Sequence, residues 1–421
     1  MDAKQEADLA TKSLSKPRRS WFQVSIRTTL VLTAVCALFF ATVGRQVLEA
    51  NRRFKTVRIF LDLNCQIQYE PDNSRTVNAL RYLLGQDNYD WNQVLCIDCS
   101  SSRVTDDDLK QLESLIELRV LNLNHAPISD LGAQHLAALS NLEQLNLSNT
   151  RVSKLDFTAR MSKLSRLELG NTQVSDLIGL LQNPLLTELS LPTTKIGGKD
   201  LSTISKLKNL VELDLSYAKV GDQDIEHLQG MALTKLVLLG VDVTDVGMKS
   251  LSDMKSLSYL DLSYAAIGGE GLSHLNCVET MRSLLLEDTN VDDEDLRVVG
   301  QFHGLQELSL EGLRISDEGL VHLQNLRQLR SLNLEGTKIN GAGLKYVSQH
   351  ESLENINLYN VPVTDDGLAY LLQLPKPCTV EIWNSRASQA MIDSFSKRPV
   401  GTTTPGLVVG PSTIRVGPKK R

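Results

Sequence analysis

Two cysteines with a metal-binding or redox spacing are the first residues of this 421-residue chain that could perform chemistry. Cys96 and Cys99 form a C-x-x-C pair, which in other proteins holds a metal ion or cycles between thiols and a disulfide. Here the alternation of apolar and polar residues places Cys99 in a buried strand position and Cys96 on the opposite face, so the thiols point apart. We therefore predict a structural role. A disulfide between Cys65 and Cys96 is the alternative in an oxidising compartment.

Histidines and acidic residues also recur at matching positions. His135, His227, His274 and His322 each precede a leucine, but the segments that carry them are not neighbours, so most pairs would lie on the order of 10 Å or more apart. The runs "VTDDDL", "VDDEDL", "ISDEGL" and "VTDDGL" lack the D-x-D-x-D-G spacing of a calcium loop. Aspartate is favoured near a helix start by capping and by the helix dipole. Both patterns therefore predict structural residues and no metal site.

Short catalytic motifs are absent from the sequence. It contains no G-x-x-x-x-G-K-[ST] phosphate loop, no H-E-x-x-H metal motif and no G-x-S-x-G nucleophile turn. We therefore predict that the chain is not an enzyme and has neither a cofactor nor a small-molecule substrate. A net charge of −6 also argues against nucleic acid as a partner.

The elements that position these residues come from a repeat. "LQELSLEGLRISDEGL" begins at Leu305, and "LRSLNLEGTKINGAGL" begins 24 residues later at Leu329. Twelve such units, spaced by 22 to 24 residues, cover residues 94–376, and a partial thirteenth begins near Pro377. The units, numbered one to twelve, start at Val94, Leu118, Leu142, Leu164, Leu186, Leu210, Leu233, Leu257, Met281, Leu305, Leu329 and Leu353.

Each unit predicts one short strand followed by one helix. Leucines alternate with polar residues in the first half, and a Ser, Thr, Asp or Gly then precedes apolar residues at helical spacing. A single unit cannot bury its own apolar face, so the units must stack into a solenoid. Twelve strands about 4.8 Å apart give a sheet on the order of 50 Å long.

The pattern L-x-x-L-x-L-x-x-T-x-V followed by S/T-D-x-G-L resembles the leucine-rich repeat, in the subclass found in F-box-associated and bacterial proteins. The resemblance implies an α/β horseshoe with a parallel sheet on the concave face and helices on the convex face. The usual Asn of the family is replaced, so a continuous Asn ladder is absent and hydroxyls can supply only part of its hydrogen bonds. Threonine takes this position at Thr150, Thr172, Thr194, Thr289 and Thr337.

The N-terminus predicts a membrane anchor. Residues 28–44 contain no charge and give a helix about 25 Å long, which we interpret as a transmembrane signal anchor after a cytoplasmic tail, residues 1–27. Cleavage after Gly44 is the alternative. The leader "RRSWFQVSIRTTLVLTAV" resembles those of bacterial membrane-anchored repeat proteins. Basic residues flank the span on both sides, and the short tail favours a single-pass protein with extracytoplasmic repeats.

Caps are expected at both ends of the solenoid. Residues 45–93 predict a helical stalk and an N-terminal cap, in which the strand-like "RIFLDLNCQIQYE" and the periodic "VNALRYLLGQDNYDW" cover the edge of the first repeat. Residues 377–396 predict the C-terminal cap. The Pro-, Gly- and Thr-rich residues 397–421 predict a disordered tail.

Two groups on the concave face are our candidate partner-binding residues. The first, the tyrosine patch, comprises Asp214, Tyr217, Tyr259, Asp261 and Tyr264. The second, the acidic strip, comprises Glu287, Asp288, Glu307, Glu311 and Glu335. The only bases at outward strand positions are Arg166 and Lys235.

Three functions fit this surface. The leading hypothesis is a membrane-anchored scaffold that binds a protein or peptide, with a basic partner matching the acidic strip. The alternatives are a structural envelope protein whose repeats pack laterally and a cytoplasm-facing adaptor similar to the F-box-associated proteins. Polar side chains that merely keep the face soluble would explain the same residues without a partner.

Overall fold

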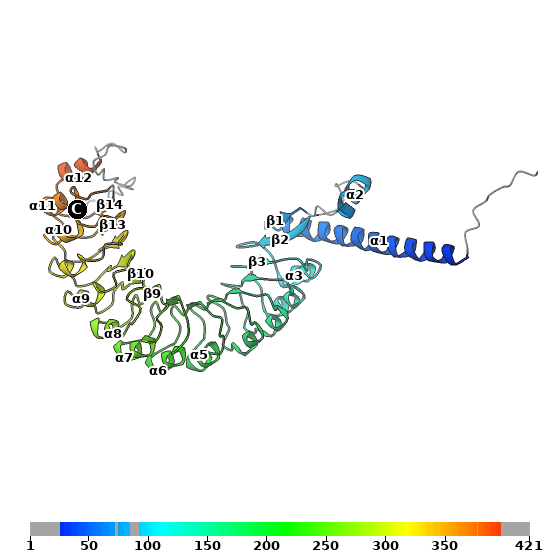
Figure 1. Cartoon of the computed structure of the whole chain (residues 1–421), viewed down its shortest axis with the longest axis horizontal. Coiled ribbons are helices and arrows are strands. Elements are labelled where there is room, and N and C mark those ends of the chain that lie inside the picture. Colours follow the sequence, from blue (N-terminus) through cyan, green and yellow to red (C-terminus); the bar gives the residue numbers. More distant parts are fainter. Residues whose placement is uncertain (1–25, 72–74, 85–91, 377, 397–421) are drawn as a thin grey trace, which may run out of the picture.

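The repeated strand positions form one continuous curved sheet in the computed structural model, which describes residues 26–71, 75–84, 92–376 and 378–396 (Figure 1). The predicted tail at residues 397–421, most of the tail at residues 1–27, Pro377 and residues 85–91 lie outside the described residues. The strands are β1 Gln66–Glu70, β2 Gln93–Asp98, β3 Val120–Asn122, β4 Gln144–Asn146, β5 Arg166–Glu168, β6 Glu188–Ser190, β7 Glu212–Asp214, β8 Lys235–Val237, β9 Tyr259–Asp261, β10 Ser283–Leu285, β11 Glu307–Ser309, β12 Ser331–Asn333, β13 Asn355–Tyr359 and β14 Thr379–Trp383.

Helices line the outer side of this sheet. The α-helices are α1 Ile26–Asp62, α2 Arg75–Leu84, α3 Asp106–Leu112, α4 Asp130–Ala133, α5 Gly198–Ile204, α6 Asp222–Ile225, α7 Asp245–Met248, α8 Gly269–Ser273, α9 Leu296–Val299, α10 Leu344–Val347, α11 Asp365–Leu371 and α12 Gln389–Ser396. The 3-10 helices are η1 Gln134–Ala138, η2 Asp156–Arg160, η3 Ile178–Gln182, η4 Glu226–Leu228, η5 Lys249–Leu251 and η6 Gly319–Leu323. The two 22-residue repeats, three and four, have only the tighter 3-10 form, as does the 24-residue repeat ten.

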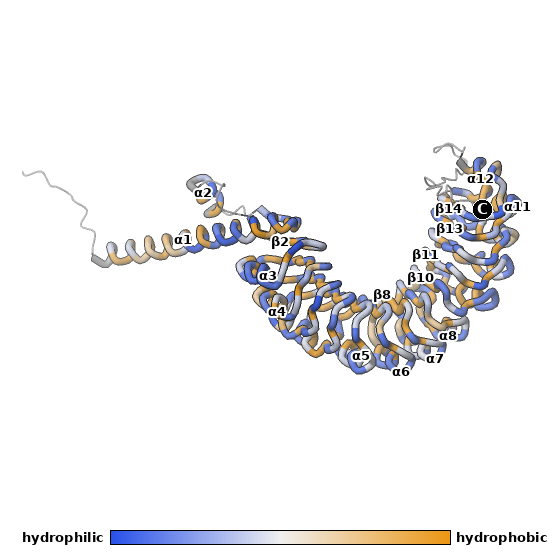
Figure 2. The backbone as a smooth tube through the Cα atoms, turned by 180° about the vertical axis from the view of Figure 1, so that it is seen from behind, coloured by the Kyte–Doolittle hydropathy of each residue, from blue (hydrophilic) through white to orange (hydrophobic). Residues whose placement is uncertain are grey.

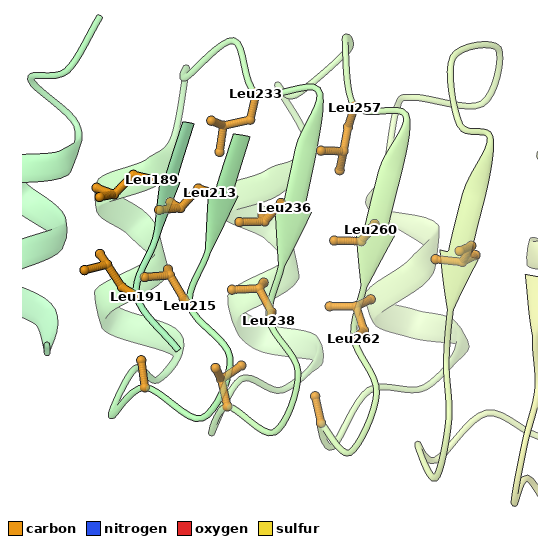
Figure 3. Packing of buried hydrophobic residues seen from close by; sticks show 14 of the residues in the cluster. Leu189, Leu191, Leu213, Leu215, Leu233, Leu236, Leu238, Leu257, Leu260 and Leu262 are labelled. Carbon is orange, nitrogen blue, oxygen red and sulfur yellow. The ribbon is translucent and has the colours of Figure 1, made fainter. Parts of the chain in front are cut away.

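Strand order follows the sequence from β1 to β14. Strands β2 to β14 are parallel, and equivalent leucines align between repeats, as Leu213, Leu236 and Leu260 do. These leucines point into the space between sheet and helices, where they are almost fully buried (Figure 3). The predicted leucine-rich repeat solenoid is therefore confirmed, with the predicted register.

Aspartates join successive repeats on the convex side. Asp222 accepts hydrogen bonds from the backbone N–H of Thr244 (2.7 Å), from the Thr244 hydroxyl (2.7 Å) and from the N–H of Gly247 (3.1 Å). The same contact links Asp106 to Ser129, Asp130 to Ser153, Asp245 to Gly268 and Gly271, Asp293 to Ser316, Asp317 to Gly341 and Gly343, and Asp365 to Ser388. This aspartate ladder connects the helix starts of seven repeats to the repeat that follows, where the family's Asn ladder is lacking.

The glycine of the S/T-D-x-G-L sequence follows from the same contact. A Cβ atom on Gly132 would lie 2.3 Å from Oδ1 of Asp106, and one on Gly271 would lie 2.4 Å from Oδ1 of Asp245. No side chain fits while the preceding aspartate occupies this place. The threonine hydroxyls, as expected, supply only local bonds: that of Thr150 donates to the carbonyl of Leu147 in its own repeat (2.6 Å).

Helix α1 continues from the apolar segment into the solenoid. It is long and apolar enough to cross a membrane, and its first half is mostly apolar (Figure 2). Its last turns bury Val57 and Phe60 in the core, and the Thr56 hydroxyl lies 3.0 Å from that of Ser114. The strand-like prediction for Arg58–Asp62 was wrong: an i, i+3 pair of buried side chains stabilises helix here.

The remaining N-terminal elements differ in part from the expectation. Strand β1 pairs antiparallel with β2 and so covers the edge of the sheet. Helix α2, in contrast, packs Val77 and Leu80 against Ala50 of α1 and not against the first repeat. At the other end, β14 pairs with β13, and α12 buries Phe395.

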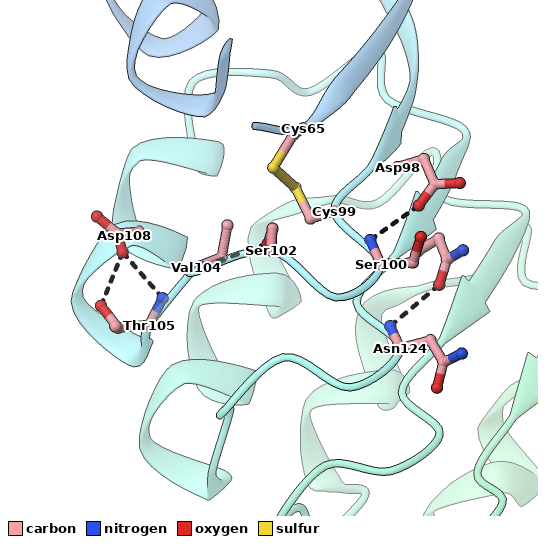
Figure 4. The surroundings of a disulfide bond; sticks show 10 residues. Cys65, Asp98, Cys99, Ser100, Ser102, Val104, Thr105, Asp108 and Asn124 are labelled. Atoms are coloured by element: carbon pink, nitrogen blue, oxygen red, sulfur yellow. Dashed lines mark hydrogen bonds between the residues drawn. A yellow bond between two sulfur atoms is a disulfide. The ribbon is translucent and has the colours of Figure 1, made fainter. Parts of the chain in front are cut away.

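A disulfide fastens α1 to the repeats. Cys65 follows α1 and is bonded to Cys99, which lies just after β2, with the two Cα atoms 4.4 Å apart (Figure 4). The alternative of pairing Cys65 with Cys96 was wrong, because Cys96 faces away from the core, as its register predicted. Cys277 and Cys378 are buried free thiols.

Candidate functional site

Outward strand positions form the concave face. In each repeat the middle strand residue is a buried apolar side chain, and the residues on either side of it point away from the core. The predicted outward residues therefore share this face, and the repeats bring them into rows across neighbouring strands (Figure 1).

Repeats four to seven carry both positive and negative side chains on the concave face. Arg166 on β5 donates to Glu168 (2.9 Å) and lies 2.9 Å from Glu188 on β6, and Lys235 on β8 lies 3.9 Å from Glu212 on β7. These five residues, which we call the paired segment, line a shallow hollow of about 230 Å³ together with Asp214. The two bases were predicted to face outward, but the paired segment was not among the predicted partner-binding residues. Opposite charges at outward positions of adjacent repeats were the available signal.

The tyrosine patch contains two aromatic residues with unusual backbone geometry. The residue after each strand turn adopts the left-handed conformation in repeat after repeat, for example Asn149, Asn171 and Gly240. Tyr217 and Tyr264 take this position at φ 56° and 62°, where Gly or Asn is ordinarily preferred. Their side chains are 54% and 53% exposed. The Tyr217 ring lies over Gly240 of the next repeat, where a side chain in place of the glycine hydrogen would collide with the ring.

The other members of the tyrosine patch are less accessible. Tyr259 is half-buried, and the Nζ atom of Lys235 lies 5.1 Å from its ring centre. Burial, followed by the negative charges of Asp261, Glu307 and Asp214, raises the pKa of Tyr259 to about 12. Asp261 is only 8% exposed and accepts a bond from the N–H of Ser263 (2.9 Å). It therefore contributes charge more than contact area.

The acidic strip lies on strands β10 to β12 and the turns that follow them. Its carboxylates accept hydrogen bonds from neutral donors of adjacent repeats: Glu287 from Ser309 (3.0 Å), Glu307 from Ser283 (3.0 Å), Glu311 from Asn333 (2.9 Å) and Glu335 from Asn357 (3.1 Å). Within the described residues, no lysine, arginine or histidine forms an ion pair with any member of the strip.

Mutual repulsion within the strip is visible at Glu287. Burial raises the pKa of this carboxyl, and the charges of Glu311, Asp261 and Asp288 raise it further, while the Ser309 hydrogen bond opposes the shift. The carboxylate of Asp261 in the tyrosine patch thus acts on the acidic strip, which connects the two groups electrostatically at repeats eight to ten.

The described part of the chain contains no cluster of three or more His, Cys, Asp or Glu side chains arranged to hold a metal ion. Of the recurring histidines, His135 forms a contact with a carboxylate. Nδ1 of His135 lies 2.7 Å from Glu113 of the preceding repeat.

Comparison with known proteins agrees with this architecture. Residues 117–137 and 253–275 match a family model described as Leucine Rich repeat, whereas no curated protein matches the chain. The crystal structure of an internalin (inlF) from Listeria monocytogenes is similar with 22% identity and a TM-score of 0.53, over 72% of this chain and 93% of the internalin. A leucine-rich repeat protein from Leptospira interrogans is similar with 21% identity and a TM-score of 0.49, over 68% of this chain and 84% of that protein.

A third similar structure is the plant peptide hormone receptor RGFR1 in complex with RGF2, at 16% identity and a TM-score of 0.40, over 66% of this chain and 53% of the receptor. At 22% identity the internalin structure bears on the fold alone, and the other two structures, whose TM-scores are below 0.5, support nothing further. The repeat register, the fourteen-stranded sheet and the family-model matches together show that this chain has the leucine-rich repeat fold.

Proposed function

We propose that the chain is a membrane-anchored recognition module whose concave face, at repeats eight to eleven, binds a basic segment of a protein or peptide. The observation that carries the proposal is the acidic strip, because its carboxylates have no cationic partner within the described residues. Leucine-rich repeat folds commonly act as scaffolds for protein interaction, and solenoids use extended concave surfaces for this purpose.

Local contacts prepare this surface for a ligand. Side-chain amides and hydroxyls hold Glu287, Glu311 and Glu335 in fixed positions without neutralising them. A basic ligand would then gain charge-assisted hydrogen bonds while little side-chain freedom is lost. Tyr264 lies near Asp288, Glu287 and Glu311 with an exposed ring, and such rings also accept cationic side chains.

The direct test measures binding of a fluorescein-labelled peptide of alternating lysine and serine to the full chain in a nonionic detergent. Charge reversal in the variant Glu307→Lys, Glu311→Lys, Glu335→Lys should weaken binding by about a hundredfold. The matched control Glu226→Lys, Glu270→Lys, Glu318→Lys changes the same charge at exposed positions on the helical side. Equal weakening by both variants would mean that net charge alone governs binding, and unchanged binding in the first would refute the proposal.

Placement outside the cytoplasm is part of the same proposal. Its support is the Cys65–Cys99 disulfide, since disulfides persist in oxidising compartments. Protease added to intact cells should remove a tag placed after Arg421 while a cytoplasmic control protein survives. Protection of the tag until lysis would instead favour a cytoplasm-facing adaptor.

A further inference from the structure

The concave face of the last repeats is an unpartnered sheet surface. Figure 1 shows the helices of the repeats on the outer side, and strands β9 to β14 line the inner side of the curve. The acidic strip lies on this inner side, on β10 to β12 and the turns after them. An occupant of this surface must therefore supply positive charge in an extended, accessible segment.

The chain itself contains such a segment. Residues 397–421 follow α12 and include six lysines and arginines but no aspartate or glutamate. Four of these bases lie within the last seven residues, separated from the first two by an uncharged stretch at residues 399–414. The six bases are Lys397, Arg398, Arg415, Lys419, Lys420 and Arg421.

The length of this segment matches the distance to the acidic strip. Strand β14 is separated from β10 by four strand steps of about 4.8 Å, or roughly 19 Å along the sheet. A chain of 25 residues spans at most about 80 Å and has a root-mean-square length of about 27 Å as a coil. Its basic end therefore reaches every strip carboxylate without stretching.

We propose that residues 415–421 bind the acidic strip of the same molecule and that an external basic partner must displace them. The inference rests on the proposed function, because the same carboxylates would hold both ligands. As an attached segment, the tail acts at an effective concentration on the order of 1 mM. It would weaken an external ligand about tenfold if its own dissociation constant is about 100 µM.

The first test is carbodiimide coupling of the full chain in a nonionic detergent, which joins only lysines and carboxylates in direct contact. Peptide mass spectrometry should find Lys419 or Lys420 joined to Glu307, Glu311 or Glu335, and not to Glu226, Glu270 or Glu318 of the helical side. Mixing nitrogen-15-labelled and unlabelled chains before coupling distinguishes the sources. Links that join one labelled to one unlabelled chain would assign the strip to the tail of a second copy and overturn the proposal, as would the absence of links.

The second test measures competition with the lysine–serine peptide. The full-chain variant Arg415→Gln, Lys419→Gln, Lys420→Gln, Arg421→Gln should bind this peptide about tenfold more tightly than the unaltered chain. The variant Lys419→Arg, Lys420→Arg keeps the charge and should behave like the unaltered chain. Unchanged affinity in the glutamine variant, with binding still lost on charge reversal of the strip, would refute the tail proposal alone. If charge reversal also has no effect, the proposed function fails as well.

Discussion

Two regions of the concave face carry charge in different ways. In repeats four to seven, Arg166 lies 2.9 Å from both Glu168 and Glu188, and Lys235 lies 3.9 Å from Glu212. In repeats nine to eleven, the acidic strip receives hydrogen bonds only from hydroxyls and amides within the described residues. Both regions have the same strand register and a buried leucine in the middle of each strand, so the difference comes from the outward residues.

This contrast shows how the fold separates stability from recognition. Inward residues fix the register, and outward residues can change charge without changing the sheet. Neutral donors hold the strip carboxylates in position but leave their charge in place, which favours a ligand of opposite charge and costs about a few tenths of a kcal/mol for each close pair. In the paired segment each glutamate instead has a cationic partner, so its three glutamates and two bases leave a net charge of only −1.

The largest expected effect tests whether the aspartate ladder stabilises the repeats of both regions equally. Asp222 and Asp293 occupy equivalent rungs of the aspartate ladder, beneath the paired segment and beneath the strip respectively. Each substitution to alanine leaves donors of the next repeat unpaired, so we expect each to lower the free energy of unfolding by about 2 to 3 kcal/mol. Urea denaturation followed by circular dichroism measures both. A much smaller loss for Asp293→Ala would mean that the aspartate ladder contributes less to stability beneath the strip than beneath the paired segment.

Removing the cation of the paired segment should make it resemble the strip. Arg166→Ala leaves Glu168 and Glu188 without their partner, so binding of the lysine–serine peptide should tighten about threefold, equivalent to about 0.7 kcal/mol. Fluorescence anisotropy measures the change. Arg166→Lys retains the charge and serves as the control. If alanine and lysine give equal affinities, pairing does not explain the contrast between the regions.

The smallest effect concerns proton binding within the strip. The folded-state pKa of Glu287 is raised, so its ionised form destabilises the fold above that pKa, and the penalty disappears as the pH falls below the ordinary value of 4.5. Glu287→Gln keeps an acceptor for Ser309 and should raise the free energy of unfolding at pH 7 by about 0.5 kcal/mol. The gain should vanish near pH 4. Glu226→Gln, on the helical side, should show no gain at either pH, and a gain for Glu287→Gln that persists at pH 4 would contradict this reasoning.

Most of the fold could be predicted from the sequence because its leucines recur with a fixed period. Each strand and its outward residues followed from the alternation, as Leu332 between Ser331 and Asn333 illustrates. The aspartate ladder could not be predicted in this way. Asp222 precedes its partner Thr244 by 22 residues, and a local reading of "GDQDI" assigns its carboxylate to its own helix start.

The N-terminal elements were harder because the periodic pattern ends there. In "RIFLDL", Ile59 and Leu61 alternate as in a strand, while Val57 and Phe60 have helical spacing, and packing against the first repeat decides for the helix. The disulfide partner of Cys65 depends on that packing. Within the candidate site, outward positions were predictable, but ion pairing across strands depends on side-chain directions that the sequence does not specify.

The Cys65–Cys99 bond also determines how a pull would travel through the molecule. If the repeats were drawn away from α1 by a bound partner, tension would pass directly between the two sulfur atoms and bypass the 33 residues between them in sequence. Strand β1 and helix α2 would therefore bear no load. Without the disulfide, the hydrogen bonds between β1 and β2 would carry the force and would break one pair at a time. The disulfide thus makes the first repeat the point where force from α1 enters the solenoid, and it prevents β1 from separating stepwise from β2 under load.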